Sequence, residues 1–152
     1  MDNKKMVQVL EPIVRLENVR SMGVIGDPGC EGLGTYNMKV YAGALEESGQ
    51  DDITLIAGDL VPDGTGHHYQ AIQKLTEALA GNPVYCLRGN HDTGAYAEYF
   101  GLKNYALLTD DFAVVVLDNA VRSFEEEGLL LLKQVLSMDE VERAVIAFHI
   151  PV

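Results

Sequence analysis

Short apolar segments alternate with longer amphipathic segments along almost the whole chain, and this alternation restricts the possible folds more than any other feature. Apolar runs with the length of buried strands cover 22–25, 53–57, 84–87, 112–117 and 144–148. Helical spacing of apolar residues marks 35–47 and 67–80. A further amphipathic helix is predicted to begin at Ser123, with Glu126 at the spacing of a capping box. The alternation of strands and helices is typical of an α/β fold with a largely parallel sheet and crossover helices.

Length and composition indicate one globular domain. The chain has 152 residues, of which 47% are hydrophobic and 22% charged, and no repeat or linker divides it, so we expect a single domain over residues 1–152. The formal net charge of −12 disfavours extended nucleic acid and membranes as partners, because both bind cationic surfaces. A single phosphate ester stays compatible with this charge where metal ions supply the positive charge. Because the sequence has no signal-peptide core and no membrane-spanning apolar run, we expect cytoplasmic localisation.

Four of the predicted strands are followed by a side chain that can bind a metal ion. These residues are Asp27, Asp59, Asn90 and His149, and a glycine directly precedes the first three. Because ligands of open α/β sheets bind beyond the carboxyl ends of the strands, we expect the four side chains to lie close together. Carboxylate, amide and imidazole groups together suit borderline divalent ions such as Mn, Fe, Co, Ni or Zn. The alternative is a set of capped turns without a metal.

Four blocks of this sequence resemble the motifs of the calcineurin-like metallophosphoesterase family. The blocks are Gly26-Asp27, Gly58-Asp59-Leu60-Val61-Pro62-Asp63-Gly64, Gly89-Asn90-His91-Asp92 and His149-Ile150-Pro151-Val152. They occur in the family's order, and the resemblance covers about residues 22–152. It implies an α/β fold, a metallophosphoesterase-like sandwich of two mixed β-sheets flanked by α-helices, with a two-metal phosphoesterase centre.

The resemblance also implies a role for each matching residue. Asp27 would bind the first metal ion, Asp59 would bridge both ions, and Asn90 and His149 would hold the second. His91 would be the catalytic residue that faces the substrate, a phosphomonoester or phosphodiester, and stabilises the phosphoryl group or protonates the leaving oxygen. The attacking group would be a hydroxide that bridges two divalent ions, which could be Mn, Fe, Zn, Co or Ni.

Further polar residues near these blocks are candidates for supporting roles. Asp63 could fix the loop after the bridging carboxylate or, like Asp92, support the metal ligands. Arg88 could bind a substrate phosphate with its planar guanidinium or pair with an acidic side chain, and the sequence leaves both alternatives open. Asp118 ends the predicted strand at 112–117 but is not expected to be a ligand, because no glycine precedes it and it matches no block.

The sequence departs from the family's pattern at two places. Gly29 stands where the first block usually has a histidine, and the closing Gly-His-x-His block does not follow His149. We therefore expect a domain that is truncated after its fourth motif and exposes a strand edge, which could lead to homo-oligomers. The alternative is a catalytically impaired relative that serves as a scaffold for protein–protein interaction.

Overall fold

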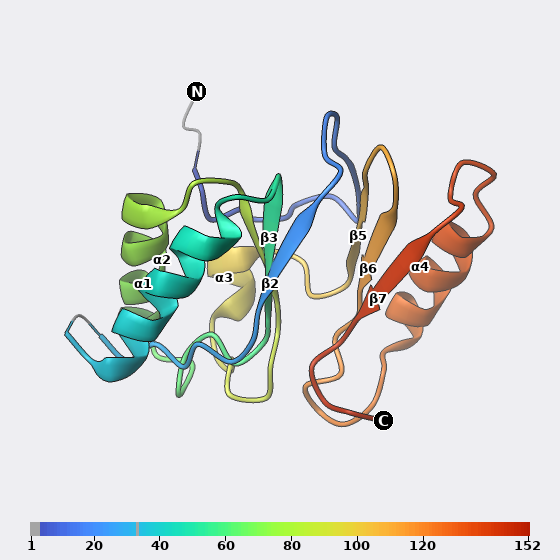
Figure 1. The fold of residues 1–152 in the computed structure, drawn as a ribbon. Coiled ribbons are helices and arrows are strands. Elements are labelled where there is room, and N and C mark those ends of the chain that lie inside the picture. Colours follow the sequence, from blue (N-terminus) through green and yellow to red (C-terminus); the bar gives the residue numbers. More distant parts are fainter. Residues whose placement is uncertain (1–3, 33) are drawn as a thin grey trace.

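The computed structural model describes residues 4–32 and 34–152, and in them two β-sheets pack against each other with helices on both outer sides (Figure 1). The first sheet contains, in spatial order, the parallel strands β2 (Met22–Ile25), β3 (Ile53–Ala57) and β4 (Val84–Leu87). The second contains, in spatial order, β1 (Ile13–Arg15), β5 (Tyr105–Leu108), β6 (Ala113–Val116) and β7 (Ala144–Ala147). The sandwich of two sheets flanked by helices is confirmed. Only the second sheet is mixed, because β5 and β6 are antiparallel.

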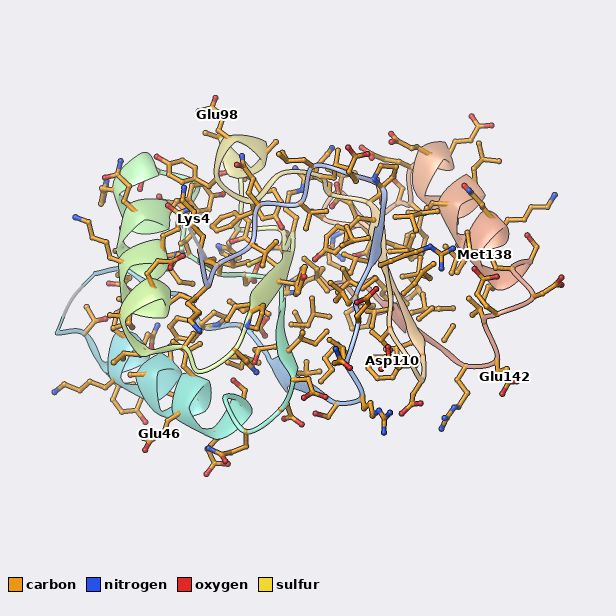
Figure 2. The ribbon with its side chains drawn as sticks, turned by 90° about the horizontal axis from the view of Figure 1, so that it is seen from above. Lys4, Glu46, Glu98, Asp110, Met138 and Glu142 are labelled. Carbon is orange, nitrogen blue, oxygen red and sulfur yellow. The ribbon has the colours of Figure 1, made fainter. Side chains whose placement is uncertain are left out.

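In residues 4–32 and 34–152, four helices cover the sandwich. They are α1 (Tyr36–Ser48), α2 (Gly66–Leu79), α3 (Tyr96–Phe100) and α4 (Glu126–Leu136). In the view from above, α1 and α2 lie on one side and α4 on the other, and side chains fill the layers between them (Figure 2). Within the described residues, no helix combines the length and the apolar character that crossing a bilayer requires.

The period of two along each strand divides the apolar core into three layers. Between the sheets, Leu55 packs with Leu107 and other side chains that point inward from both sheets. Ile56, the next residue of β3, points the opposite way, into the layer beneath α1, α2 and α3. Val115 of β6 points outward in the same manner and packs with Leu131 of α4. Because both faces of β3 and β6 are covered, these strands read as continuous apolar runs in the sequence.

The predicted elements agree with the structure to within one residue at each end, except that three short elements were not predicted and one helix start is wrong. β2, β3 and β4 have the predicted bounds, while β1, α3 and β5 were not predicted. The predicted capping box at Ser123 is wrong, because α4 begins at Glu126 with Glu125 as its N-cap residue. The Glu125 carboxylate accepts hydrogen bonds from Lys103 at 3.1 Å and Asn104 at 2.8 Å, and these contacts with a distant segment fix the chain at the helix start.

Each sheet ends on one side in a strand that carries exposed apolar side chains. On β2, the edge strand of the first sheet, Val24 is 60% exposed. On β7, the edge strand of the second, Val145 and Ile146 are each 43% exposed. In the part of the chain that the structure describes, neither strand is paired along its outer side. Unpaired edges with apolar side chains are prone to pair with another chain.

We predict that the chain associates through these edges as its concentration rises. Val24→Lys and Val145→Lys each place a charge on a strand edge, and each should shift the population toward monomer. Size-exclusion chromatography with light scattering over a concentration series measures this shift.

Leu130→Lys is the matched control, because Leu130 is also 60% exposed but lies on α4. A monomer at every concentration, or equal weakening by the control, would contradict the prediction.

Candidate metal centre

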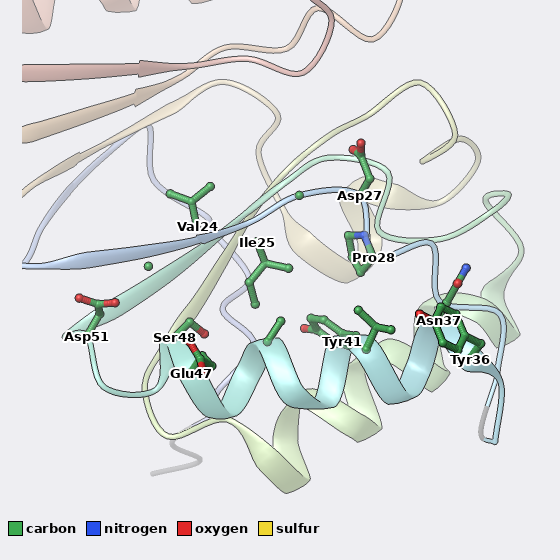
Figure 3. A pocket seen from close by; sticks show the side chains of 14 residues that line it. Val24, Ile25, Asp27, Pro28, Tyr36, Asn37, Tyr41, Glu47, Ser48 and Asp51 are labelled. Carbon is green, nitrogen blue, oxygen red and sulfur yellow. The ribbon is translucent and has the colours of Figure 1, made fainter.

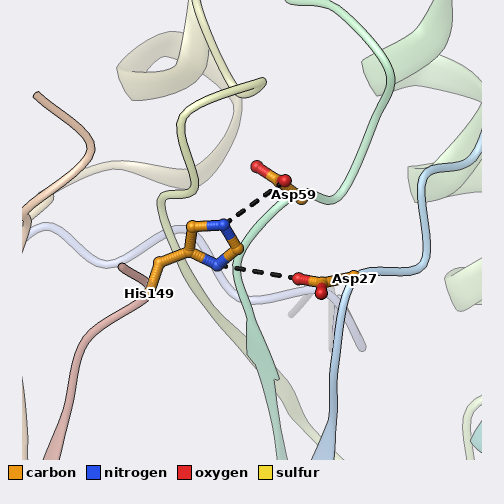
Figure 4. A group of neighbouring side chains, drawn as sticks. All are labelled: Asp27, Asp59 and His149. Carbon is orange, nitrogen blue, oxygen red and sulfur yellow. Dashed lines mark ion pairs between the residues drawn. The ribbon is translucent and has the colours of Figure 1, made fainter. Parts of the chain in front are cut away.

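Three of the predicted ligands meet where the strand ends of the two sheets come together (Figure 4). Asp27 follows β2, Asp59 follows β3 and His149 follows β7. The Nε2 atom of His149 lies 3.3 Å from Oδ2 of Asp59, and its Nδ1 atom lies 3.6 Å from Oδ1 of Asp27. One ligand atom from each of the three residues lies within 4.8 Å of the others. The first sheet thus contributes two carboxylates and the second sheet an imidazole.

A backbone carbonyl orients the ring of His149. The Nδ1 atom lies 2.8 Å from the carbonyl oxygen of Ala57. Since a carbonyl only accepts hydrogen bonds, Nδ1 carries a proton, and in the neutral ring Nε2 keeps its lone pair. Metal ligands of this kind lie about 2.0–2.2 Å from a zinc ion, so two of them on one ion are roughly 3 Å apart. The spacing between Nε2 and Asp59 is compatible with one ion held by both.

The two carboxylates sit on strained backbone. Asp27 has a φ angle of +44° and Asp59 of +49°, both in the left-handed region that residues with a Cβ seldom adopt.

Close packing explains two of the three glycines that directly precede predicted ligands. A Cβ at Gly58 would overlap the ring of His149, and a Cβ at Gly89 would overlap Asp59, whereas a Cβ at Gly26 would meet open space. Glycine is therefore required by close approach at 58 and 89 but not at 26.

Asn90 lies beside this cluster on the loop after β4. Its two neighbours in the chain both contact Asp59, because Gly89 packs against that residue and the backbone N–H of His91 donates to Asp59 Oδ1 at 3.0 Å. Asn90 itself is exposed. The fourth predicted ligand therefore sits on a loop that is held directly against the second.

His91 is exposed, and its ring is fixed at one nitrogen. Nδ1 donates to the carbonyl oxygen of Pro62 at 2.9 Å, so Nε2 is the nitrogen left for a ligand. The hydrogen bond to Pro62 raises the pKa of His91 above its ordinary value, and the nearby charge of Asp59 raises it further. Both effects favour the doubly protonated ring, in which Nε2 can donate a proton.

Asp92 and Asp63 hold the loops around the cluster. Asp92 is buried and accepts hydrogen bonds from the backbone N–H groups of Gly89 at 2.8 Å and Val61 at 3.2 Å, so it joins the loops after β3 and β4. Burial raises the pKa of Asp92 to about 7, although these hydrogen bonds oppose the shift. Asp63 is exposed and accepts a hydrogen bond from the backbone N–H of Thr65 at 3.0 Å. It therefore stabilises the turn that leads into α2.

Arg88 pairs with an acidic side chain, one of the two alternatives that the sequence left open. Its guanidinium donates to Oδ1 of Asp118 at 3.1 Å and to Oδ2 at 2.7 Å. Asp118 is only 1% exposed and also lies 3.6 Å from the ammonium group of Lys103. Arg88 and Asp118 therefore form an ion pair with each other and do not belong to the cluster of candidate ligands.

Gly29, which stands where the first block usually has a histidine, contacts the site through its backbone. Gly29 has a φ angle of +52°, and its N–H donates to the carbonyl oxygen of Asp59 at 2.9 Å. Within the described ranges, His149 is the only histidine that joins Asp27 and Asp59 in a cluster with metal-ligand spacing.

Sequence reasoning missed Asn119, which is buried directly after Asp118. Its side chain forms hydrogen bonds with the backbone of His149 and Ile150. The only signal in the sequence was a pair of polar residues at the end of a strongly apolar strand.

A groove of about 620 Å³ lies between β2 and α1 (Figure 3). Exposed apolar residues of its lining include Val24, Tyr36 and Val40. Asp27 lies at its rim, with the carboxylate pointing away from α1 (Figure 3). The groove is therefore next to the carboxylate cluster and does not contain it.

The comparison with known families agrees with this geometry. The sequence profile of the calcineurin-like phosphoesterase family matches residues 21–151, a range that includes every candidate ligand described above. No curated protein matches the chain. A family match over nearly the whole length shows that the chain belongs to the calcineurin-like phosphoesterase family.

Proposed function

We propose that this chain hydrolyses a phosphomonoester or phosphodiester with the help of two divalent metal ions. The family to which it belongs consists generally of metal-dependent phosphoesterases. The observation that carries the proposal is the convergence of Asp27, Asp59 and His149 from three strand ends. Asp27 would hold one ion, Asp59 would be shared, and His149 and Asn90 would hold the other.

The charges of the cluster support metal binding. The Asp27 side chain is 70% exposed and that of Asp59 21% exposed, and within the described residues the only basic side chain within 4.0 Å of either carboxylate is His149, which carries no charge while its Nε2 keeps a lone pair. No lysine or arginine of the described residues lies within ion-pair distance of either carboxylate. Divalent ions bound there would supply positive charge for the phosphate, lower the pKa of a bound water and stabilise the entering and leaving oxygens.

His91 is the residue that we assign to the leaving group. Its Nδ1 is committed to the carbonyl oxygen of Pro62, which directs Nε2 away from that loop. The ring is exposed, and its backbone N–H is bonded to Asp59, so a substrate at the metal centre can reach it. The hydrogen bond to Pro62, the larger cause of the raised pKa of His91, favours the form that donates a proton to the departing oxygen.

A non-catalytic scaffold for a protein partner is the second candidate. The observation in its favour is Gly29, which provides no imidazole at the first metal position and bonds to the Asp59 carbonyl instead. Hydrolysis that depends on both Mn and His91 would exclude this alternative.

We predict that His91→Ala slows hydrolysis most for esters with poor leaving groups. Loss of a general acid should lower kcat by roughly 10²–10⁴-fold on an alkyl phosphate. The effect on p-nitrophenyl phosphate should be smaller, because its leaving group departs without a proton. Initial rates with added Mn for both esters measure the difference.

His67→Ala is the matched control for this experiment, since His67 is exposed at the start of α2. An equal loss on both esters would contradict proton donation by His91. Hydrolysis of neither ester by the wild-type protein with bound metal would favour the scaffold.

We also predict that the two metal positions differ in affinity. Asp59, Asn90 and His149 offer three ligands to one ion, whereas Asp27 and Asp59 offer two to the other. The ion with three ligands should therefore be bound more tightly. Calorimetric titration with Mn should show that His149→Ala removes the tight equivalent and that Asp27→Ala retains it. The reverse result would show that the ligand assignment is wrong.

A further inference from the structure

Asn119 holds the backbone that carries His149. Its Oδ1 atom accepts hydrogen bonds from the N–H groups of His149 at 3.1 Å and Ile150 at 3.0 Å, and its Nδ2 atom donates to the carbonyl oxygen of Ile150 at 2.7 Å. Asn119 is 1% exposed. The buried side-chain amide of Asn119 thus forms three hydrogen bonds with the backbone of two consecutive residues, and only one of its N–H groups is not used in them.

The side chain of Asn119 takes over where the pairing of β6 and β7 stops. The last backbone hydrogen bond between these segments joins the N–H of Leu117 to the carbonyl oxygen of Ala147 at 2.9 Å. Beyond it the chain after β7 diverges from β6 and reaches toward the first sheet, where the His149 ring meets Ala57. Without the amide of Asn119, the backbone of His149 would have no partner in the second sheet.

The neighbouring residue fixes Asn119 in place. Asp118 is bound by two hydrogen bonds from Arg88, and its backbone N–H donates to Oδ1 of Asn104 at 2.8 Å. Arg88 is the first residue after β4 and stands two positions before Asn90. Two consecutive residues at the end of β6 therefore hold the loop after β4 and the loop after β7, which belong to different sheets.

We propose that Asn119 is a positioning residue that sets the place of His149 relative to the ligands of the first sheet. In protein metal sites, ligand distances lie within about 0.2 Å of the values typical of the metal and the ligand atom. Three directional hydrogen bonds from one buried amide restrict the orientation of the backbone at His149 and Ile150 as well as its position, whereas apolar contacts are not directional. The expected effect of Asn119 on metal binding rests on the proposed function. The placement of His149 by Asn119 does not depend on that function.

The test compares Asn119→Ala with Asn82→Ala. Asn82 is 5% exposed and likewise forms three hydrogen bonds, with Thr54, Ser48 and Asp51, but it lies at the opposite end of the first sheet, before β4. Both variants should lower Tm by similar amounts, because each loses one buried amide and its three bonds. Asn82→Ala therefore reports what loss of stability alone does to the site.

The first readout is the His149 ring in the metal-free protein, followed by two-dimensional ¹H–¹⁵N NMR of the imidazole nitrogens. The wild type and Asn82→Ala should show Nδ1 protonated and held in one state, as the bond to Ala57 requires, and Asn119→Ala should show exchange broadening at Nδ1. The second readout is calorimetric Mn titration, in which Asn119→Ala should bind about 10–100-fold more weakly and Asn82→Ala should be unchanged.

An ordered His149 ring in Asn119→Ala would overturn the proposal, and so would equal effects of the two variants on the ring. Wild-type protein that binds no Mn would contradict the proposed function, and the ring would still decide the role of Asn119. Unchanged Mn affinity in Asn119→Ala, with a disordered ring, would overturn the link between this residue and the metal centre.

Discussion

The contact between the two sheets is the constraint on which the candidate site depends. Alternate residues of β3, β5 and β6 point into this contact, where Leu55 of β3 meets Leu107 of β5. Burial of these faces packs the two sheets face to face, so the carboxyl ends of β2, β3 and β4 lie near the end of β7. A sheet that packed only on helices would bring Asp27 and Asp59 together but would leave them without the imidazole of His149.

The carboxylates around this junction serve different purposes because their surroundings differ. Asp118 is buried against Arg88 and Lys103, which compensate its charge, so it acts as a structural link between the sheets. Asp92 is buried among backbone N–H groups and joins two loops. Asp27 and Asp59 have neither arginine nor lysine within ion-pair distance among the described residues, so their charge is available to a cation. In a chain of net charge −12, most acidic side chains of the described residues have no such partner, so the candidate ligands are distinguished by the convergence of two carboxylates with an imidazole.

The parts of the fold that could be predicted are those in which local sequence and packing agree. β2, β3 and β4 are apolar runs that stop at glycine or at a charged residue, and they have the predicted bounds. β1 has three residues and α3 five, too few for a periodic signal. The start of α4 was misplaced because contacts of Glu125 with residues about twenty positions earlier outweighed the local capping pattern at Ser123.

In the candidate site, the convergence of Asp27, Asp59 and His149 could be predicted from the rule that ligands of α/β sheets bind beyond the carboxyl ends of the strands. The bonds that orient the imidazoles could not, because they join loops distant in sequence. The bond from His91 to Pro62 spans 29 positions and that from Asn119 to His149 spans 30. Such contacts depend on how the loops after β3 and β6 pack, which no short pattern encodes.

Backbone strain bears on the choice between an enzyme and a scaffold. Left-handed conformations at Asp27 and Asp59 cost of order 1–3 kcal/mol each, and such strain concentrates at functional sites. The His149 ring packs against Gly58, and Asp59 packs against Gly89. Both contacts are closer than a residue with a Cβ would permit at position 58 or 89. A scaffold that binds through its outer surface needs neither the strain nor this close approach, because a relaxed turn at each strand end would support the same sandwich. Two of the four residues other than glycine with positive φ angles in the described part of the chain are carboxylates that converge with an imidazole, and this convergence favours a metal centre over an inert scaffold.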